Sequence, residues 1–141
     1  MPTVRIDTKA WDGLLQRVAE IGKRNVRVGL FEGDVARIGA FHELGTATIP
    51  ERSWLRSTFR ERENELATVM ARACAACLAG KVSVDRMLDL VGSWAANAVK
   101  AKIRSNIPPP LALATIRRKG SSTALIDTGR MLNAVTWKIV A

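Results

Sequence analysis

A regular stripe of apolar side chains between residues 84 and 99 constrains the fold more than any other feature of the sequence. The stripe recurs every three or four positions, the spacing that places side chains on one face of an α-helix. Its members are Val84, Met87, Leu88, Val91, Trp94, Ala95 and Val99. Ser83 is the predicted N-cap, and the prolines of NIPPP end the helix because proline lacks an amide hydrogen. We therefore predict a long helix over 83–105 with one buried face.

Two further long helices are predicted before this one. Thr8 can cap a helix over residues 9–22, with Gly22 ending it. A second amphipathic segment runs from Ser53 to Leu78 and stops at Gly80. Its apolar members are Trp54, Leu55, Phe59, Leu66, Val69 and Met70.

Shorter elements surround these helices. The segments 25–33 (NVRVGLFEG) and 135–140 (VTWKIV) alternate apolar and polar residues, which is typical of half-buried strands. A short helix is predicted over 36–44, closed by Gly45. Another turn is predicted over 128–135, with Asp127 and Thr128 as its caps.

The predicted fold is one α+β domain over residues 1–141, with long helices packed on a small β-sheet. With 141 residues the chain suits a single core. No apolar run approaches the roughly 20 residues that cross a bilayer, and the start of the sequence lacks the apolar region of a secretory signal. We expect a protein without a membrane partner that remains in the cytoplasm where it is made.

The formal net charge of +9 indicates an acidic partner. The charge is uneven, because no acidic residue lies between Asp89 and Asp127. The cations of this stretch are Lys100, Lys102, Arg104, Arg117, Arg118 and Lys119. Nucleic acid, an anionic membrane and a negatively charged protein surface are all compatible with such a composition.

Cys74 and Cys77 form a C-x-x-C pair, a spacing also found in redox and zinc sites. A redox site needs a strand-to-helix turn, and a zinc site needs a second ligand pair. The sequence offers neither, and the surrounding alanines place both thiols inside a helix. We interpret the pair as packing residues.

An enzyme is not predicted. His42 is the only histidine, and adjacent helical residues such as His42 and Glu43 point in different directions. The sequence contains no G-x-S-x-G elbow, no G-x-G-x-x-G motif and no P-loop. We predict no catalytic residues, no metal, no cofactor and no small-molecule substrate, and we interpret His42 as a packed or hydrogen-bonded residue.

Direct binding of nucleic acid is an alternative function that is compatible with the net positive charge. Residues 100–119 could contact phosphates, but they include no aromatic residue for stacking on bases. The helices on either side of Gly80 lack the polar recognition face of a helix-turn-helix motif.

Three segments together resemble a family of small virion proteins of tailed bacteriophages. They are VRVGLFEG at 26–33, AFHELGTATIPERSWLRSTF at 40–59 and IPPPLALATIRRKGSSTALIDTGRMLNAVTWKIV at 107–140. Their order and spacing are similar to those of tail-completion, neck or head–tail joining proteins. The resemblance covers most of the chain from about residue 26 onward.

This resemblance implies a structural function. The chain would form a homo-oligomeric ring, a hexamer if it follows tail symmetry, at the head-proximal end of the tail. There it would complete or cap the tail tube and couple it to neck and head proteins around the DNA channel. Assembly would take place in the host cytoplasm, and the mature location would be the virion. The alternative within this setting is a basic DNA-binding or DNA-packaging-associated phage protein.

We expect loops 45–56 and 108–123 to reach toward other subunits or the tail, because they combine turn residues with arginines that lack obvious partners. The candidate interface residues are Arg52, Arg56, Arg104, Arg117, Arg118 and Lys119. Arg52 and Arg56 could form bidentate pairs with carboxylates of the next subunit. A structural joint is predicted from His42, Gly45, Pro50, Trp54, Asp127 and Gly129.

Overall fold

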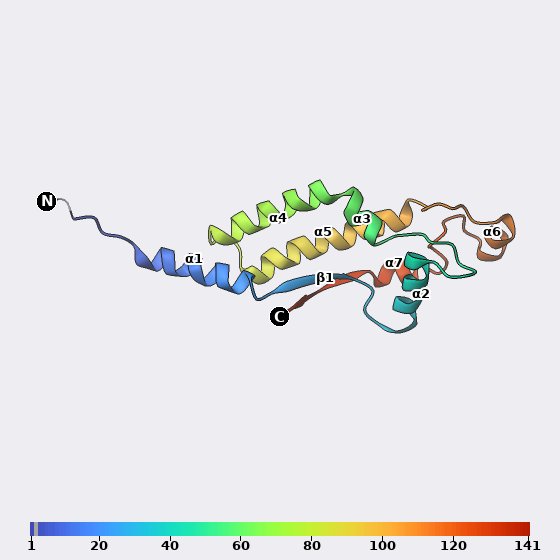
Figure 1. Ribbon diagram of the computed structural model, residues 1–141, viewed down its shortest axis with the longest axis horizontal. Coiled ribbons are helices and arrows are strands. Elements are labelled where there is room, and N and C mark those ends of the chain that lie inside the picture. Colours follow the sequence, from blue (N-terminus) through green and yellow to red (C-terminus); the bar gives the residue numbers. More distant parts are fainter. Residues whose placement is uncertain (2) are drawn as a thin grey trace.

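The helix predicted over 83–105 is the central element of the fold. The computed structural model describes residue 1 and residues 3–141, and in it α5 extends from Val84 to Arg104 (Figure 1). As predicted, the Ser83 hydroxyl caps this helix by accepting a hydrogen bond from the Arg86 amide at 3.1 Å. Ten residues of α5 are buried, so the amphipathic pattern of the sequence corresponds to a packed face.

The two predicted strands pair with each other. β1 (Asn25–Gly29) and β2 (Thr136–Val140) form a two-stranded antiparallel sheet in which Val28 lies opposite Trp137. The chain therefore brings a segment near its start against a segment near its end. The fold is a small α+β domain dominated by helix, as predicted.

α5 crosses this sheet at a very short distance. At Gly92, an added Cβ would lie 2.3 Å from Cδ1 of Trp137 and 2.9 Å from Cγ2 of Val26. The Trp137 indole also donates a hydrogen bond to Asp89 of α5 at 2.9 Å. The absence of a side chain at Gly92 is what allows the helix to lie against the indole.

The segment predicted as one amphipathic helix over 53–78 is interrupted. The structure divides it into α3 (Arg56–Glu61) and α4 (Glu63–Leu78), because Arg62 adopts non-helical dihedral angles of −114° and 24°. The Arg62 guanidinium lies 5.1 Å from the centre of the Trp94 ring, a cation–π arrangement. Trp94 is accordingly only half-buried, in contrast to its predicted place in the core stripe.

Cys74 and Cys77 both lie in α4, which confirms the helical placement of the C-x-x-C pair. Cys77 is completely buried, and burial raises the pKa of its thiol. Such a thiol is held in its protonated, unreactive form.

At the N-terminal end of the molecule, α1 spans Thr8–Ile21. The predicted cap is wrong by one residue, because Asp7 rather than Thr8 accepts the hydrogen bond from the Lys9 amide. Gly22 follows the helix as predicted.

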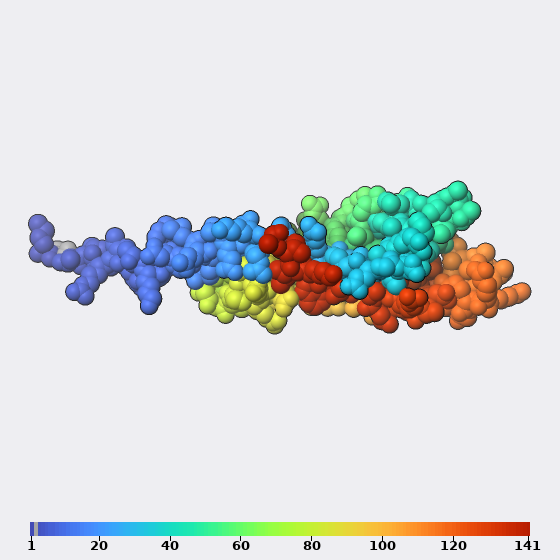
Figure 2. All heavy atoms as spheres, turned by 90° about the horizontal axis from the view of Figure 1, so that it is seen from below, coloured from blue at the N-terminus to red at the C-terminus, as the bar shows by residue number. Residues whose placement is uncertain are grey.

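Only the C-terminal half of α1 is attached to the rest of the protein. Arg17 donates a hydrogen bond to the Leu78 carbonyl at 3.0 Å. Arg24, three residues after the end of the helix, pairs with Asp85. None of the residues of α1 is fully buried. The first half of the helix extends beyond the α4–α5 hairpin, and the whole molecule is elongated (Figure 2).

The opposite end of the molecule begins with α2 (Gly33–Leu44), which contains the predicted helix over 36–44. Gly45 ends it with a positive φ of 74°, and its amide donates to the Phe41 carbonyl at 2.9 Å. This is the role that the sequence predicted for Gly45.

Two short helices, α6 (Leu113–Lys119) and α7 (Arg130–Ala134), complete this end. The predicted caps of the second one are wrong, since neither Asp127 nor Thr128 holds that position. The N-cap is Gly129, with φ of 77° and no side-chain hydrogen bond.

The core consists of two clusters along the length of α5. One lies under the α4–α5 hairpin and contains Ala73, Cys77, Val84, Met87, Leu88 and Val91. The other lies toward α2 and α7 and contains Trp54, Ala96, Val99, Ile103, Ile107, Leu125, Met131 and Val135. The second cluster therefore supports the end of the molecule on which α2, α6 and α7 lie.

We predict that Gly92→Ala destabilises the protein although alanine is the better helix former. The added methyl group overlaps the Trp137 ring, and overpacking of this kind costs roughly 1–3 kcal/mol. Gly13→Ala is the matched control, because a Cβ there meets nothing closer than the end of the Arg17 side chain at 3.4 Å. Urea denaturation should show a loss for the first variant only. Equal stability of both variants would contradict the close helix–sheet contact.

Candidate functional site

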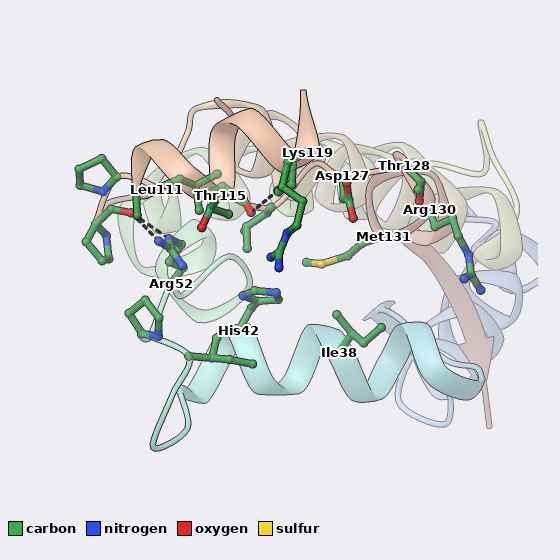
Figure 3. Close-up of a pocket in the computed structure, with 18 of the residues that line it drawn as sticks. Ile38, His42, Arg52, Leu111, Thr115, Lys119, Asp127, Thr128, Arg130 and Met131 are labelled. Atoms are coloured by element: carbon green, nitrogen blue, oxygen red, sulfur yellow. Dashed lines mark hydrogen bonds between the residues drawn. The ribbon is translucent and has the colours of Figure 1, made fainter. Parts of the chain in front are cut away.

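A pocket of about 980 Å³ opens between α2 and the segment 109–131 (Figure 3). Its apolar lining includes Val35, Ile38, Ile49, Leu125 and Met131. Its titratable side chains are His42, Arg52, Arg118, Lys119, Asp127 and Arg130. The recess thus combines apolar walls with four cationic side chains and one carboxylate.

Seven of the residues singled out in the sequence line this pocket. They are His42, Pro50, Arg52, Arg118, Lys119, Asp127 and Gly129. Arg104 and Arg117 are exposed and lie outside it. Gly45, Trp54 and Arg56 belong to the neighbouring joint between α2 and α3.

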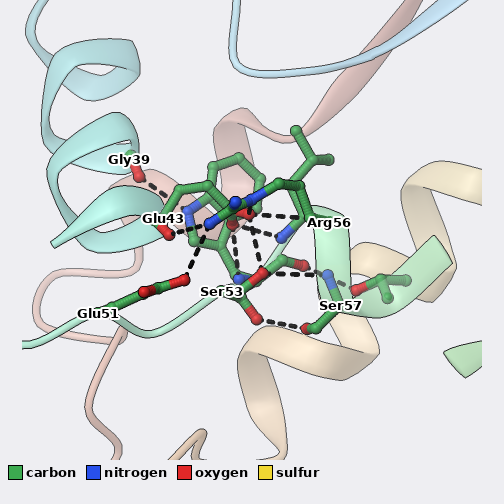
Figure 4. Close-up of polar contacts among 9 residues, drawn as sticks. Gly39, Glu43, Glu51, Ser53, Arg56 and Ser57 are labelled. Atoms are coloured by element: carbon green, nitrogen blue, oxygen red, sulfur yellow. Dashed lines mark hydrogen bonds and ion pairs between the residues drawn. The ribbon is translucent and has the colours of Figure 1, made fainter. Parts of the chain in front are cut away.

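The joint is organised by the carboxylate of Glu43, which points from α2 toward the start of α3 (Figure 4). Its Oε2 accepts hydrogen bonds from the amides of Trp54 and Leu55, each at 2.8 Å. Its Oε1 accepts from the Ser53 hydroxyl at 2.8 Å and from the Arg56 amide at 3.1 Å. Glu43 therefore caps α3 from a different helix, satisfying amides that have no partner within α3.

Trp54 is fixed beside this carboxylate. Its side chain is buried, and its indole nitrogen donates to the Gly39 carbonyl of α2 at 2.8 Å. A backbone hydrogen bond and an indole hydrogen bond thus join Trp54 to the same helix. This supports the predicted structural role of Trp54 in the core.

The prediction that Arg56 is unpaired is wrong. Its Nε donates to Glu43 at 2.8 Å, and its Nη2 donates to Glu51 at 2.9 Å and to the Glu43 carbonyl at 3.0 Å. Hydrogen bonding to Glu43 raises the pKa of this guanidinium. The side chain that was predicted to face a neighbouring subunit is held within its own chain.

Arg52 is also engaged within the chain, and it is almost completely buried at 4% exposure. Its Nε and Nη2 both donate to the Pro109 carbonyl, at 3.0 and 2.7 Å. Its own amide donates to the His42 carbonyl at 2.7 Å. Arg52 therefore ties the loop after α2 to the proline-rich segment, and the two predicted reaching loops are joined to each other.

Burial alone would favour the neutral form of Glu43. It is outweighed by the hydrogen bonds from Leu55, Arg56 and Ser53, so the pKa of the carboxyl lies below its ordinary value. The charged form is the one that the surrounding donors require.

His42 faces the pocket, while its neighbour Glu43 faces α3 (Figures 3 and 4). Burial, together with the positive charges of Arg52 and Lys119, lowers the pKa of the imidazole. The Nδ1 atom of His42 is buried without a hydrogen-bond partner among the described residues. The sequence predicted a packed or a hydrogen-bonded residue, and the structure favours the packed one. The two adjacent residues do not form a catalytic pair, in agreement with their helical geometry.

The cations around the pocket are not neutralised by carboxylates. Lys119 donates to the Thr123 and Ala124 carbonyls at 3.4 and 3.2 Å. Arg118 and Arg130 are exposed and form no ion pair within the described part of the chain. The rim of the pocket therefore presents positive charge to whatever approaches it.

Sequence reasoning missed three contributions to this region. Glu43 was considered only as a partner of His42, but its carboxylate oxygens accept hydrogen bonds from residues 53–56. Arg130 was not named, although it lines the pocket beside Gly129. The Pro109 carbonyl, which holds Arg52, leaves no trace in the sequence because every residue has a carbonyl.

No family model, curated protein or solved structure matches this chain. In the part of the chain that the structure describes, no three or more His, Cys, Asp or Glu residues group as metal ligands would. Within the same residues, no helix has both the length and the apolar character that crossing a bilayer requires.

We predict that Glu43→Gln lowers the free energy of unfolding by about 3 kcal/mol, because it leaves buried donors without a charged acceptor. Glu51→Gln is the matched control, since it removes an exposed carboxylate that also pairs with Arg56. The control should lose only a small fraction of that stability. Urea denaturation of both variants measures the difference, and similar losses would refute the central role of Glu43.

The stability of the protein should fall with acidification in two stages. The pKa values of His42 and Glu43 are both lower in the folded protein than in the unfolded chain. The contribution of each group to stability is therefore complete above its ordinary pKa and is lost as the pH falls through its folded-state pKa. The loss from His42 begins near pH 6.5, its ordinary pKa, and the loss from Glu43 begins near pH 4.5. Urea titrations from about pH 8 to about pH 3 should show both stages.

His42→Gln should remove the first stage and Glu43→Gln should reduce the second. A first stage that persists in His42→Gln would mean that another group titrates there.

Proposed function

We propose that this chain is a structural virion protein of a tailed bacteriophage, acting at the head–tail junction. It assembles as a ring that completes or caps the tail tube and couples it to the neck and head around the DNA channel. The proposal starts from the resemblance of residues 26–33, 40–59 and 107–140 to tail-completion and neck proteins. The net charge of +9 supports it as well, because a basic ring is suited to bind DNA in the channel or negatively charged protein surfaces.

The observation that carries the proposal is that these three separate segments interact with one another. Residues 26–29 of the first segment pair with 136–139 of the third in the sheet. Arg52 of the second segment binds Pro109 of the third. Sequence motifs that are far apart along the chain therefore belong to one structural unit, as expected if the resemblance reflects a common fold.

The revised interface comprises the exposed cations that form no ion pair within the described residues, rather than the arginines that are bonded within the chain. Arg118 and Arg130 at the pocket rim, together with the exposed Arg117 and Arg104 outside the pocket, are available for carboxylates of another protein. Arg52 is buried, and Arg56, although its side chain is half exposed, is hydrogen-bonded to Glu43 and Glu51. Substitution of these two arginines by alanine would disturb the fold, so it cannot report on assembly alone.

The experiment is negative-stain electron microscopy of the purified protein combined with mass measurement of the particles. We expect ring-shaped particles of uniform size, because heterologous contacts that close on themselves give rings. Hexamers are the expected stoichiometry.

A salt titration of duplex DNA binding tests the alternative function. A monomeric protein that binds DNA tightly at physiological salt, with a steep dependence on salt concentration, would favour the DNA-binding or packaging function. Weak binding together with rings favours the junction protein.

A further inference from the structure

One face of α1 carries three apolar side chains that are about half exposed among the described residues. Trp11, Leu15 and Val18 are 59%, 48% and 51% exposed, and they lie on one face of the helix. A helix of 14 residues is marginal without tertiary packing. The N-terminal half of the helix extends beyond the α4–α5 hairpin, so the described part of the chain gives it little cover there (Figures 1 and 2).

A second uncovered apolar surface lies on α2. Ile38, Phe41 and Leu44 are 45%, 42% and 64% exposed, and their spacing of three residues aligns them along the helix. Ile38 also lines the pocket, so this surface is continuous with the pocket rim. The two uncovered surfaces lie at opposite ends of the elongated chain (Figures 1 and 2).

The charges beside the two surfaces are complementary. Asp12 lies next to the apolar face of α1 and has no ion-pair partner among the described residues. Arg118 and Arg130 at the pocket rim are likewise without carboxylate partners there. A helix that packs along α2 could bring a carboxylate to these guanidinium groups.

We infer that α1 of one copy of this chain packs along the apolar surface of α2 in the next copy. A contact between opposite ends of identical chains is heterologous, and it leaves both surfaces covered in every copy only if the chain of contacts closes into a ring. Pairing of α1 with α1 in a symmetric dimer would leave the α2 surface in water. The inference rests on the proposed ring and names the two surfaces that build it.

A mixing experiment with two variants tests this arrangement. Leu15→Asp disrupts the apolar surface of α1 and leaves that of α2 intact. Phe41→Asp disrupts the apolar surface of α2 and leaves that of α1 intact. Both positions are exposed, so each variant should fold, which circular dichroism and thermal unfolding can verify. Met70→Asp, at another exposed apolar position on α4, is the matched control.

Mass photometry and size-exclusion chromatography provide the measurement. At concentrations where the wild type forms rings, each variant alone should be monomeric and the control should still form rings. An equimolar mixture of the two variants should form dimers containing one copy of each and nothing larger. This restoration by mixing distinguishes a head-to-tail contact from any other.

Three results would overturn the inference. Dimers of Phe41→Asp alone would show that α1 pairs with α1. Rings formed by both variants would show that other surfaces build the ring, with the proposed function intact. A wild-type protein that remains monomeric at every concentration would overturn the inference and the proposed ring together.

Discussion

The carboxylate of Glu43 accepts hydrogen bonds from five donors in residues 53–56, and the pocket-bearing end of the molecule depends on this arrangement. A buried carboxylate is stable only if donors surround it, so the charge of Glu43 fixes α2 against the start of α3. The same contact places Trp54 in the core and limits the course of the loop between the two helices. Arg52 lies in that loop, and its bond to Pro109 then positions the opposite wall of the pocket.

The molecule is elongated because α5 carries two core clusters one after the other along its length rather than one compact core. Each end of such a body packs against only one of the two clusters. At one end α1 extends beyond the hairpin, and at the other α2 presents apolar side chains beside a basic rim. Uncovered apolar surfaces of this kind mark places where another molecule binds. Two such surfaces at opposite ends are what the proposed head-to-tail ring requires.

Much of the fold could be predicted from residue periodicity. The apolar stripe of α5, the alternation in both strands and the helical setting of Cys74 and Cys77 all correspond to the structure. Boundaries were less accurate, because caps depend on single hydrogen bonds: Asp7 replaced Thr8, and Gly129 replaced Asp127 and Thr128. The interruption at Arg62 was missed because Phe59 and Leu66 are seven residues apart, a spacing that keeps them on one face of a continuous helix, although all six residues between them are polar. Trp94, facing that arginine, therefore packs less deeply than its spacing indicated.

By itself the sequence determined the helices, the strands and the excess of positive charge, because these follow from local spacing and composition. It also supplied seven of the residues around the pocket. Only the tertiary structure decided which arginines have partners within the chain. Arg52 and Arg56 resemble free surface cations in the sequence, but a carbonyl 57 residues away binds the buried Arg52 and a carboxylate 13 residues away binds the half-exposed Arg56. Hydrogen bonds between distant residues have no periodicity, so only the folded chain, which brings Glu43 and Pro109 to these guanidinium groups, reveals them.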